Sequence, residues 1–356
     1  MKTTASRHSH ALRRVAVALA FSLFACGASR GALAQSPNAT ADPVAEFYRG
    51  KTVNVVIGYT VGGGFDLYAR VLARDLGRFI PGNPSVVPQN MPGAASLKAV
   101  EYLFAVAPRD GTVIGTFSHT IPIAPLLGTA KFDPRELRWV GSMASETSLC
   151  VASANSPVKS WADLKRLPFT AGGTGRGSDP DMLANLLKSL FGVPIKLVSG
   201  YPGTAEIVLA TERGEVDGFC GLSLSTLTSR YKDWKDSGKV NILLQAGLQK
   251  APELPEVPMV LDLASTERER QILTLLIAPQ KMARPYAMPP GTPPARADAV
   301  RKAFAATLAD PEFLADAQKS RIDISPVFAT EIETLLARLY ATPADVVQQA
   351  VTAIGN

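Results

Sequence analysis

Three glycine-rich loops are the features of this sequence that could most readily bind a ligand. They occupy residues 58–66, 172–179 and 199–204, and each lies between a run of strand-forming residues and an amphipathic segment. A helix that begins after such a loop leaves its first backbone N–H groups without intrahelical partners, and the positive end of its dipole faces the loop. Because glycine lets a ligand approach the backbone, the three loops together predict a site for a small anion that needs no lysine.

The candidate ligand-binding residues come from these loops and from two neighbouring segments. Hydroxyl groups would add short donors, and Arg176 could clasp a carboxylate through two parallel hydrogen bonds, although a solvated loop arginine explains it equally well. Asp66 is also interpreted as the N-cap of the following helix, and Asp217 as part of a local salt bridge. The full candidate set is Thr60, Gly62, Gly63, Gly64, Asp66, Ser118, Gly173, Thr174, Gly175, Arg176, Ser178, Tyr201, Gly203, Thr204 and Asp217.

The motifs of nucleotide-binding proteins and of common enzymes are missing from these loops. The first loop lacks Gly-Lys-Ser/Thr, and the glycines at 173–177 break the spacing of G-x-G-x-x-G. His119 is the only histidine after residue 34, which excludes a metal site with two imidazoles. We therefore predict no catalytic residue, no metal and no cofactor. A hydrolase built on His119 beside Ser118 and Thr120 is the enzymatic alternative.

Strand and helix patterns alternate along the chain and place each loop at the end of a strand. A strand at 53–57 precedes the first loop, and a helix with one apolar face follows it to residue 80. The pattern begins again near residue 148, where a strand at 169–171 leads through the second loop to a helix opened by Asp179 as N-cap and Pro180 as first residue. This alternation predicts an α/β fold with mainly parallel sheets.

The first 34 of the 356 residues have the pattern of an export signal. Four basic residues precede an apolar run at 15–25, and Ala32-Leu33-Ala34 is a small-x-small cleavage site before Gln35. We expect cleavage there rather than lipid anchoring at Cys26, because bulky Phe24 fits a lipoprotein signal poorly. The mature protein is therefore expected in the periplasm.

Charge and cysteine content narrow the classes of partner. The sequence has a net charge of +6, but residues 1–34 contain five basic residues and no acidic one, so the rest of the chain has a net charge of +1. Its basic residues are scattered among acids, which argues against nucleic-acid binding. An oxidising compartment would permit a disulfide between Cys150 and Cys220, but two buried free thiols explain them equally well.

Seven short motifs, in order along the chain, resemble those of one receptor family. The strongest runs from Lys51-Thr52-Val53 through Gly-Gly-Gly-Phe-Asp at 62–66 to Ala69-Arg70. The others lie at 89–94, 108–112, 201–205, 214–217, 255–258 and 290–293. On these motifs the chain resembles the substrate-binding proteins of tripartite tricarboxylate transporters, also called the Bug receptors.

The resemblance implies a two-lobed periplasmic-binding-protein architecture of type II, a "Venus flytrap". One lobe would comprise residues 43–145 plus 250–356, and the other residues 146–249. Loops of both lobes would grip a small organic acid, such as a di- or tricarboxylate or an aromatic carboxylate. The implied partners are the permease subunits of a membrane transporter, and the receptor would act as a monomer.

The sequence also departs from the family pattern. Thr60-Val61 replaces the usual Pro-Ala, the loop at 172–179 carries Arg176, and Asp179 stands near where a histidine is common. These changes leave the identity of the solute open. A sensor that delivers its ligand to a membrane kinase is the alternative role for the same fold.

Overall fold

The computed structural model describes residues 42–355. The predicted signal segment, its cleavage site and Cys26 lie outside the described residues. Across residues 42–355 we find no helix whose length and apolar character would let it span a membrane.

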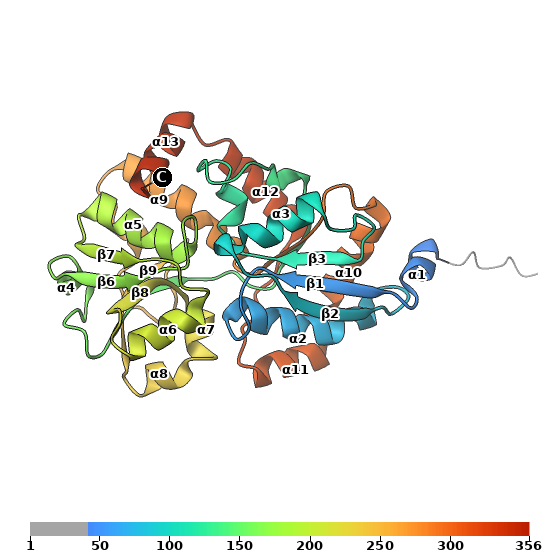
Figure 1. The fold of residues 1–356 in the computed structure, drawn as a ribbon, viewed down its shortest axis with the longest axis horizontal. Helices are drawn as coiled ribbons and strands as arrows, with labels where there is room; N and C mark the ends of the chain where they lie inside the picture. Colours follow the sequence, from blue (N-terminus) through green and yellow to red (C-terminus); the bar gives the residue numbers. More distant parts are fainter. Residues whose placement is uncertain (1–41, 356) are drawn as a thin grey trace, which may run out of the picture. The chain divides into compact units, whose positions relative to one another are not determined.

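The strands of the described chain form two sheets (Figure 1). In the six-stranded sheet the order is β11-β4-β10-β3-β1-β2, and β1 pairs in parallel with both β2 and β3. Strand β10 runs antiparallel to its neighbours β3 and β4. The bounds are β1 (Thr52–Ile57), β2 (Ser85–Asn90), β3 (Val113–Thr116), β4 (Arg138–Ser142), β10 (Pro285–Met288) and β11 (Val327–Phe328).

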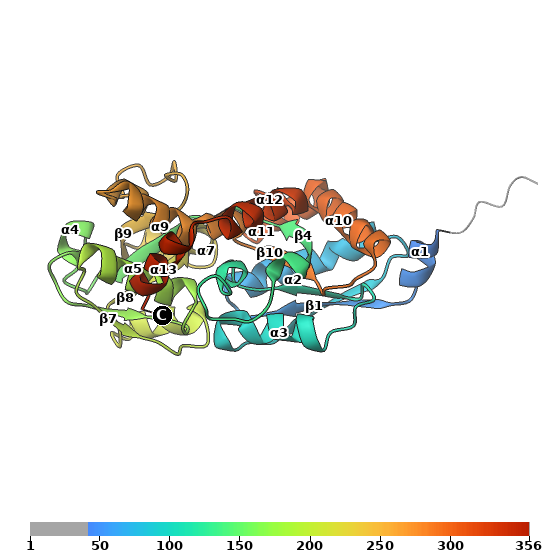
Figure 2. The same ribbon diagram turned by 90° about the horizontal axis from the view of Figure 1, so that it is seen from above.

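Each face of this sheet is covered by helices because side chains alternate along its strands. Val53, Val55 and Ile57 of β1 face the core shared with α2, α10 and α11, whereas Val56 faces the core shared with α3 and α12. Figures 1 and 2 show α2 and α3 on opposite faces. The helices near this sheet are α1 (Pro43–Tyr48), α2 (Gly64–Phe79), α3 (Leu97–Ala105), α10 (Pro294–Ala309), α11 (Pro311–Lys319) and α12 (Ala329–Tyr340).

The five-stranded sheet has the order β7-β6-β8-β5-β9. Strand β6 pairs in parallel with β7 and β8, and β5 runs antiparallel to β8 and β9. The bounds are β5 (Ser148–Ser153), β6 (Phe169–Gly172), β7 (Ile195–Val198), β8 (Gly218–Ser223) and β9 (Val240–Ala246). The predicted α/β class is confirmed. The sheets are mixed, because β10 and β11 in the first sheet and β5 in the second run antiparallel to their neighbours.

Helices also cover both faces of the second sheet. One core joins β5, β6 and β9 to α5, α9 and α13, and the other joins β5 and β8 to α6, α7 and α8. The bounds are α4 (Trp161–Leu164), α5 (Asp179–Phe191), α6 (Thr204–Glu212), α7 (Leu224–Thr228), α8 (Lys232–Asp236), α9 (Glu267–Ile277) and α13 (Ala344–Ala353). The predicted boundaries assign α9 and α13 to the first lobe, whereas both helices pack against the second sheet. The lobe boundaries stay a prediction.

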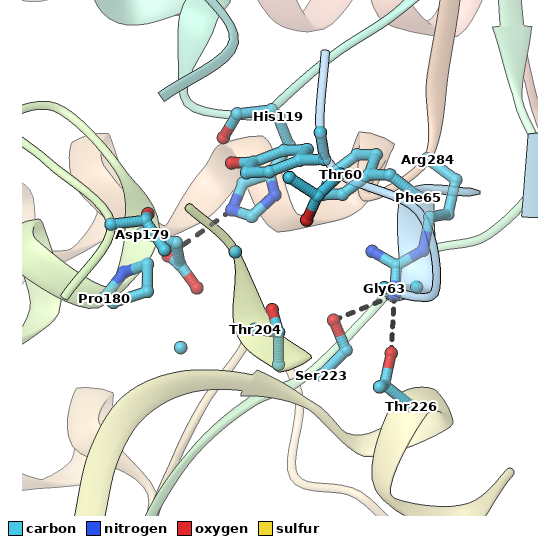
Figure 3. A pocket seen from close by; sticks show the side chains of 16 residues that line it. Thr60, Gly63, Phe65, His119, Asp179, Pro180, Thr204, Ser223, Thr226 and Arg284 are labelled. Carbon is cyan, nitrogen blue, oxygen red and sulfur yellow. Dashed lines mark hydrogen bonds and ion pairs between the residues drawn. The ribbon is translucent and has the colours of Figure 1, made fainter. Parts of the chain in front are cut away.

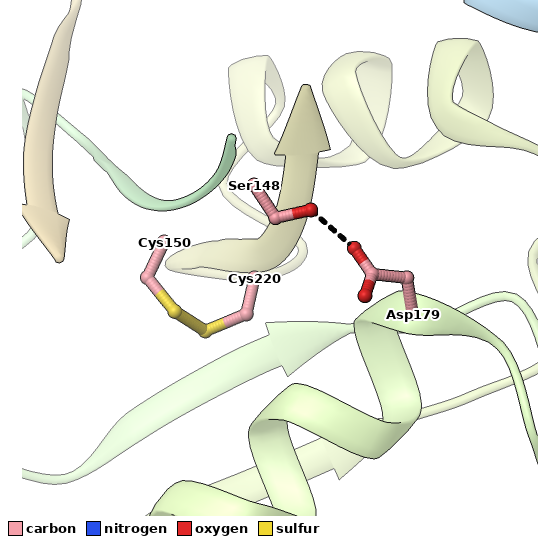
Figure 4. The surroundings of a disulfide bond; sticks show 4 residues. All are labelled: Ser148, Cys150, Asp179 and Cys220. Atoms are coloured by element: carbon pink, nitrogen blue, oxygen red, sulfur yellow. Dashed lines mark hydrogen bonds between the residues drawn. A yellow bond between two sulfur atoms is a disulfide. The ribbon is translucent and has the colours of Figure 1, made fainter. Parts of the chain in front are cut away.

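A disulfide joins Cys150 of β5 to Cys220 of β8 inside the second sheet (Figure 4). Both cysteines are fully buried in the core shared with α5. The link closes a loop with a sequence separation of 70, and a loop of that length is expected to contribute a few kcal/mol to stability, about 2–4 in typical cases. Of the two interpretations that the sequence left open, the structure has the disulfide.

The start of α5 differs from its prediction. Asp179 was expected as the N-cap, but the N-cap is Ser178, whose hydroxyl accepts a hydrogen bond from the backbone N–H of Asp181. Asp179 is instead the first residue of the helix, followed by Pro180. The difference matters because it turns the carboxylate of Asp179 away from the capping position.

Candidate functional site

A pocket lies where loops of the two sheets meet (Figure 3). Its volume is about 40 Å³. Both hydroxyl-bearing and charged side chains contribute to the wall. The lining residues are Tyr59, Thr60, Gly63, Gly64, Phe65, Ser118, His119, Thr174, Asp179, Pro180, Gly203, Thr204, Gly221, Ser223, Thr226 and Arg284.

The start of α2 forms one wall. Gly63 is the N-cap of this 16-residue helix, and no side chain caps its first N–H groups. Gly64 lies so close to the opposite wall that an added Cβ would be 2.6 Å from Thr226 Oγ1. Uncapped N–H groups at a helix start favour an anion.

Two other candidates of the first loop, Gly62 and Asp66, stabilise the conformation of that loop. Asp66 accepts a hydrogen bond from the backbone N–H of Gly62 at 2.9 Å and forms an ion pair with Arg70 at 2.8 Å. Gly62 has a φ of +93°, a conformation that favours glycine. Neither residue lines the pocket. Asp66 therefore organises the turn, but it is the third residue of α2 and not the predicted N-cap, which is Gly63.

The start of α6 forms a second wall of the same kind. Gly203 is the N-cap, again without a side-chain cap, and Thr204 follows it into the pocket. An added Cβ at Gly203 would be 2.8 Å from Thr60 Oγ1, so the loops of the two sheets nearly touch. Tyr201 lies outside this pocket and lines a neighbouring hollow with Gly58.

The loop at 172–179 converges on the pocket but turns most of its donors inward. Asp181 accepts hydrogen bonds from the Gly175 backbone N–H at 3.1 Å and from the hydroxyls of Ser178 and Ser199. An added Cβ at Gly173 would be 2.2 Å from Asp181 Oδ1, so that carboxylate fills the space over the glycine. From this loop and helix start, only Thr174, Asp179 and Pro180 line the pocket.

Two further candidates lie away from the pocket. Arg176 lines a different hollow, with Met182 and Asn185 of α5. Asp217 accepts hydrogen bonds from the Thr170 backbone N–H at 2.8 Å and from the Ser156 hydroxyl at 3.2 Å, which fixes the start of β8 to β6. Ser118 does line the pocket, and its hydroxyl lies 2.8 Å from Thr120 Oγ1.

Arg284 is a pocket residue that the sequence reasoning missed. It precedes β10, its exposed fraction is 2 %, and its Nη2 donates to Ser223 Oγ at 2.9 Å. The guanidinium carbon lies 4.9 Å from the ring centroids of both Phe65 and Tyr68. A buried arginine is rare unless it is paired, so an arginine inside the apolar run at 282–288 was the available signal.

Glu146, which does not line the pocket, partly neutralises the charge of Arg284. Glu146 Oε2 lies 3.6 Å from Arg284 Nη2, and the Ser225 hydroxyl also donates to Glu146. Arg284 Nε is buried and has no hydrogen-bond partner among the described residues. The guanidinium therefore retains a donor for a ligand.

A second charged group, Asp179, stands on the opposite side of the pocket from Arg284 (Figure 3). Its carboxylate accepts hydrogen bonds from Gln280 at 3.1 Å and from the Ser148 hydroxyl, as Figure 4 shows for Ser148. His119 Nε2 lies 3.4 Å from Asp179 Oδ1. Burial alone would raise the pKa of Asp179, but the nearby His119 and these hydrogen bonds hold that pKa below its usual value.

His119 does not have the contacts of a general base. Its exposed fraction is 5 %, and neither ring nitrogen has a hydrogen-bond partner among the described residues. A nucleophilic hydroxyl would need a hydrogen bond to the imidazole, whereas the Ser118 hydroxyl faces Thr120. Within residues 42–355, no three His, Cys, Asp or Glu side chains gather as a metal site would require.

Comparisons with known proteins agree on one family. Residues 68–348 match the model of the tripartite tricarboxylate transporter family receptor. A curated protein of Cupriavidus necator, named for the 5′ region of gbd, is 26 % identical over 246 residues, which cover 67 % of this chain and 71 % of that one.

Solved structures share the fold. The periplasmic binding protein BugD is 20 % identical with a TM-score of 0.68, covering 85 % of this chain and 98 % of that one. MatC from Rhodopseudomonas palustris, solved with bound malate, is 19 % identical with a TM-score of 0.66, covering 83 % and 99 %. A further R. palustris protein, solved with adipate, is 20 % identical with a TM-score of 0.64, covering 84 % and 97 %.

Proposed function

The chain belongs to the tripartite tricarboxylate transporter receptor family, and on this premise we propose that it is a periplasmic solute-binding protein for a small carboxylate. The observation that carries the proposal is the buried guanidinium of Arg284 beside two helix starts without side-chain caps, those of α2 and α6. Guanidinium groups and uncapped backbone N–H groups are the donors that carboxylates prefer.

Two relatives of similar fold support this ligand class. MatC was solved with malate and the second R. palustris protein with adipate, both of them dicarboxylic acids. In this chain the residues proposed to contact the carboxylate are Thr60, Gly63, Gly203, Thr204 and Arg284, which come from loops of both sheets.

We further propose that the two sheets are the centres of two lobes that separate to admit the solute. Because loops of both sheets line the small pocket, we expect its walls to move outward when the solute enters. The chain crosses between the sheets from β4 to β5 and from β9 to β10, and such crossings are natural hinges. Delivery of the solute to membrane permease subunits by an exported monomer completes the proposal.

Calorimetric titration of the mature protein with succinate, malate, adipate, citrate and benzoate tests the ligand class. A carboxylate that binds should also raise the melting temperature, because it stabilises the folded state by mass action. The proposal fails if no carboxylate binds while a neutral sugar or a simple amine does.

A variant of Arg284 locates the carboxylate. Arg284→Lys keeps a charge beside Glu146 but loses the planar fork of donors, so we expect affinity for the bound carboxylate to fall about tenfold or more. Arg268→Lys, whose side chain on α9 is 42 % exposed and lies outside the pocket, is the matched control and should bind as the wild type does. Equal affinity of both variants would remove Arg284 from the site.

A further inference from the structure

The two charged groups that line the pocket have opposite signs, and this bears on the chemistry of the solute. Figure 3 shows Arg284, with Ser223 and Thr226, on one side and Asp179 on the other. A receptor for a plain dicarboxylate would have to place a second negative group near the carboxylate of Asp179. Two close carboxylates in a buried site repel each other.

The compensation of these two charges is unequal. Arg284 already has Glu146 as a buried counter-ion, 3.6 Å away. Asp179 is held by the hydroxyl of Ser148 and the amide of Gln280, which are both uncharged. These neutral donors orient the carboxylate but supply no positive charge.

His119 is the cationic candidate nearest to Asp179, but its geometry is loose. The two atoms are 3.4 Å apart, and the contact is not a hydrogen bond, since both ring nitrogens of His119 are buried without one. A polar ring that lines the pocket with unpartnered nitrogens indicates that a ligand group is missing at this end. An ammonium group at this end of the pocket would donate to the Asp179 carboxylate.

The starts of α2 and α6 differ from the start of α5 in the charge of the ligand group that they suit. The glycine N-caps of α2 and α6 leave N–H groups that suit an anion. At α5 the N-cap hydroxyl of Ser178 already accepts from Asp181, and Asp179 adds a negative charge in the first turn. The α5 end is therefore the end suited to a cation.

We propose that the solute is an amino carboxylate with its two charges at opposite ends: its carboxylate meets Arg284 and the starts of α2 and α6, and its ammonium group meets Asp179. The inference rests on the proposed function and specifies its substrate class. The aromatic rings of Phe65 and Tyr59, stacked with centroids 4.7 Å apart, line the pocket between its Arg284 end and its Asp179 end.

Matched ligand pairs test the inference on the wild-type protein. Glutarate and 4-aminobutyrate, and adipate and 5-aminopentanoate, differ only in whether one end is a carboxylate or an ammonium group. We expect the amino member of at least one pair to bind about tenfold tighter or more, the size of a hydrogen bond to a charged group. Tighter binding of the dicarboxylate in both pairs overturns the inference and leaves the proposed function standing, whereas no binding of any carboxylate defeats both.

A variant then locates the ammonium group. Asp179→Asn can still accept from Gln280 and still meets Ser148, so the fold should persist. Its affinity for the amino member should fall about tenfold or more, while that for the dicarboxylate stays the same or rises. Asp163→Asn, on α4 and outside the pocket, is the control and should keep the wild-type preference. An unchanged preference in Asp179→Asn overturns the assignment, and the wild-type titrations decide the substrate class even if this variant fails to fold.

Discussion

The helix starts of α2 and α5 follow the same sequence pattern of strand, glycine-rich loop and helix, yet they present opposite chemistry to the pocket. At α2 the N-cap is glycine, no side chain caps the helix, and Gly63 and Gly64 line the pocket. At α5 the N-cap is a serine that already accepts a hydrogen bond, and the residue that reaches the pocket is Asp179.

The difference comes from what the nearby acidic residue does. Asp66, in the first turn of α2, points to Gly62, Arg70 and Asn90, away from the pocket. Asp181, in the first turn of α5, instead accepts from Gly175 and Ser178 of its own loop and from Ser199 of the loop at 199–204. Glycine-rich loops before helices are thus not anion sites as a class; they are anion sites only when their N–H groups remain unsatisfied.

Removing Asp181 should have the largest effect. Asp181→Ala leaves the Gly175 N–H and the buried Ser178 hydroxyl without their acceptor, whereas the exposed Ser199 hydroxyl can turn to water. Buried donors without partners cost about 1–3 kcal/mol each. We expect the free energy of unfolding to fall by about 2–4 kcal/mol, measured by urea denaturation. Asp163→Ala, on α4 and outside the pocket, is the control and should lower the free energy of unfolding by about 1 kcal/mol or less. A stable variant with altered ligand binding would show that the α5 loop is open to the solute.

Adding a cap to α2 should weaken binding. Gly63 has extended backbone angles and no atom within 4 Å of an added Cβ, so Gly63→Ser fits without a clash. Its hydroxyl would accept from the first N–H groups of α2 and compete with the carboxylate, so we expect an affinity loss of about tenfold, equal to about 1.4 kcal/mol. Calorimetric titration measures it.

Ser178→Ala is the matched test at the other helix. Losing the cap of α5 should lower stability by about 1 kcal/mol and leave carboxylate affinity unchanged. If Gly63→Ser binds carboxylates normally and Ser178→Ala does not, the comparison between the two helix starts is reversed.

The smallest expected effect is on the pH dependence of stability. Because the native pKa of Asp179 is lowered, its stabilising contribution is fully present above the pKa of the unfolded chain, about 3.9, and is lost as pH falls through the lower native value. The stability difference between wild type and Asp179→Asn should therefore be constant above about pH 5 and should shrink below pH 4. Urea denaturation between pH 3 and 7 measures it, and parallel curves would contradict a lowered pKa.

The sequence predicted the elements well because local patterns encode them. The apolar face after the first loop became α2, and the run near 195–198 became β7 (Ile195–Val198). The nearness of the loops at 172–179 and 199–204 followed from the rule that parallel strands end at one edge of a sheet. The loop at 58–66 belongs to the other sheet, so its meeting with them depends on how the two sheets pack. The rule does not say which donors in a loop are already used, and so Gly173, Gly175 and Ser178 were counted as ligand contacts although they contact Asp181.

The sequence by itself determined the α/β class, the family motifs and the glycine-containing loops before α2 and α6, because each depends on residues that are neighbours along the chain. Only the tertiary structure decided that Cys150 meets Cys220 and that Arg284 faces Asp179 across the pocket. Those pairs are separated by 70 residues or more, and their meeting depends on how sheets pack and where the chain crosses between them. The charge distribution of the site is therefore a property of the packed sheets, while the ability to hold an anion is already present in single loops.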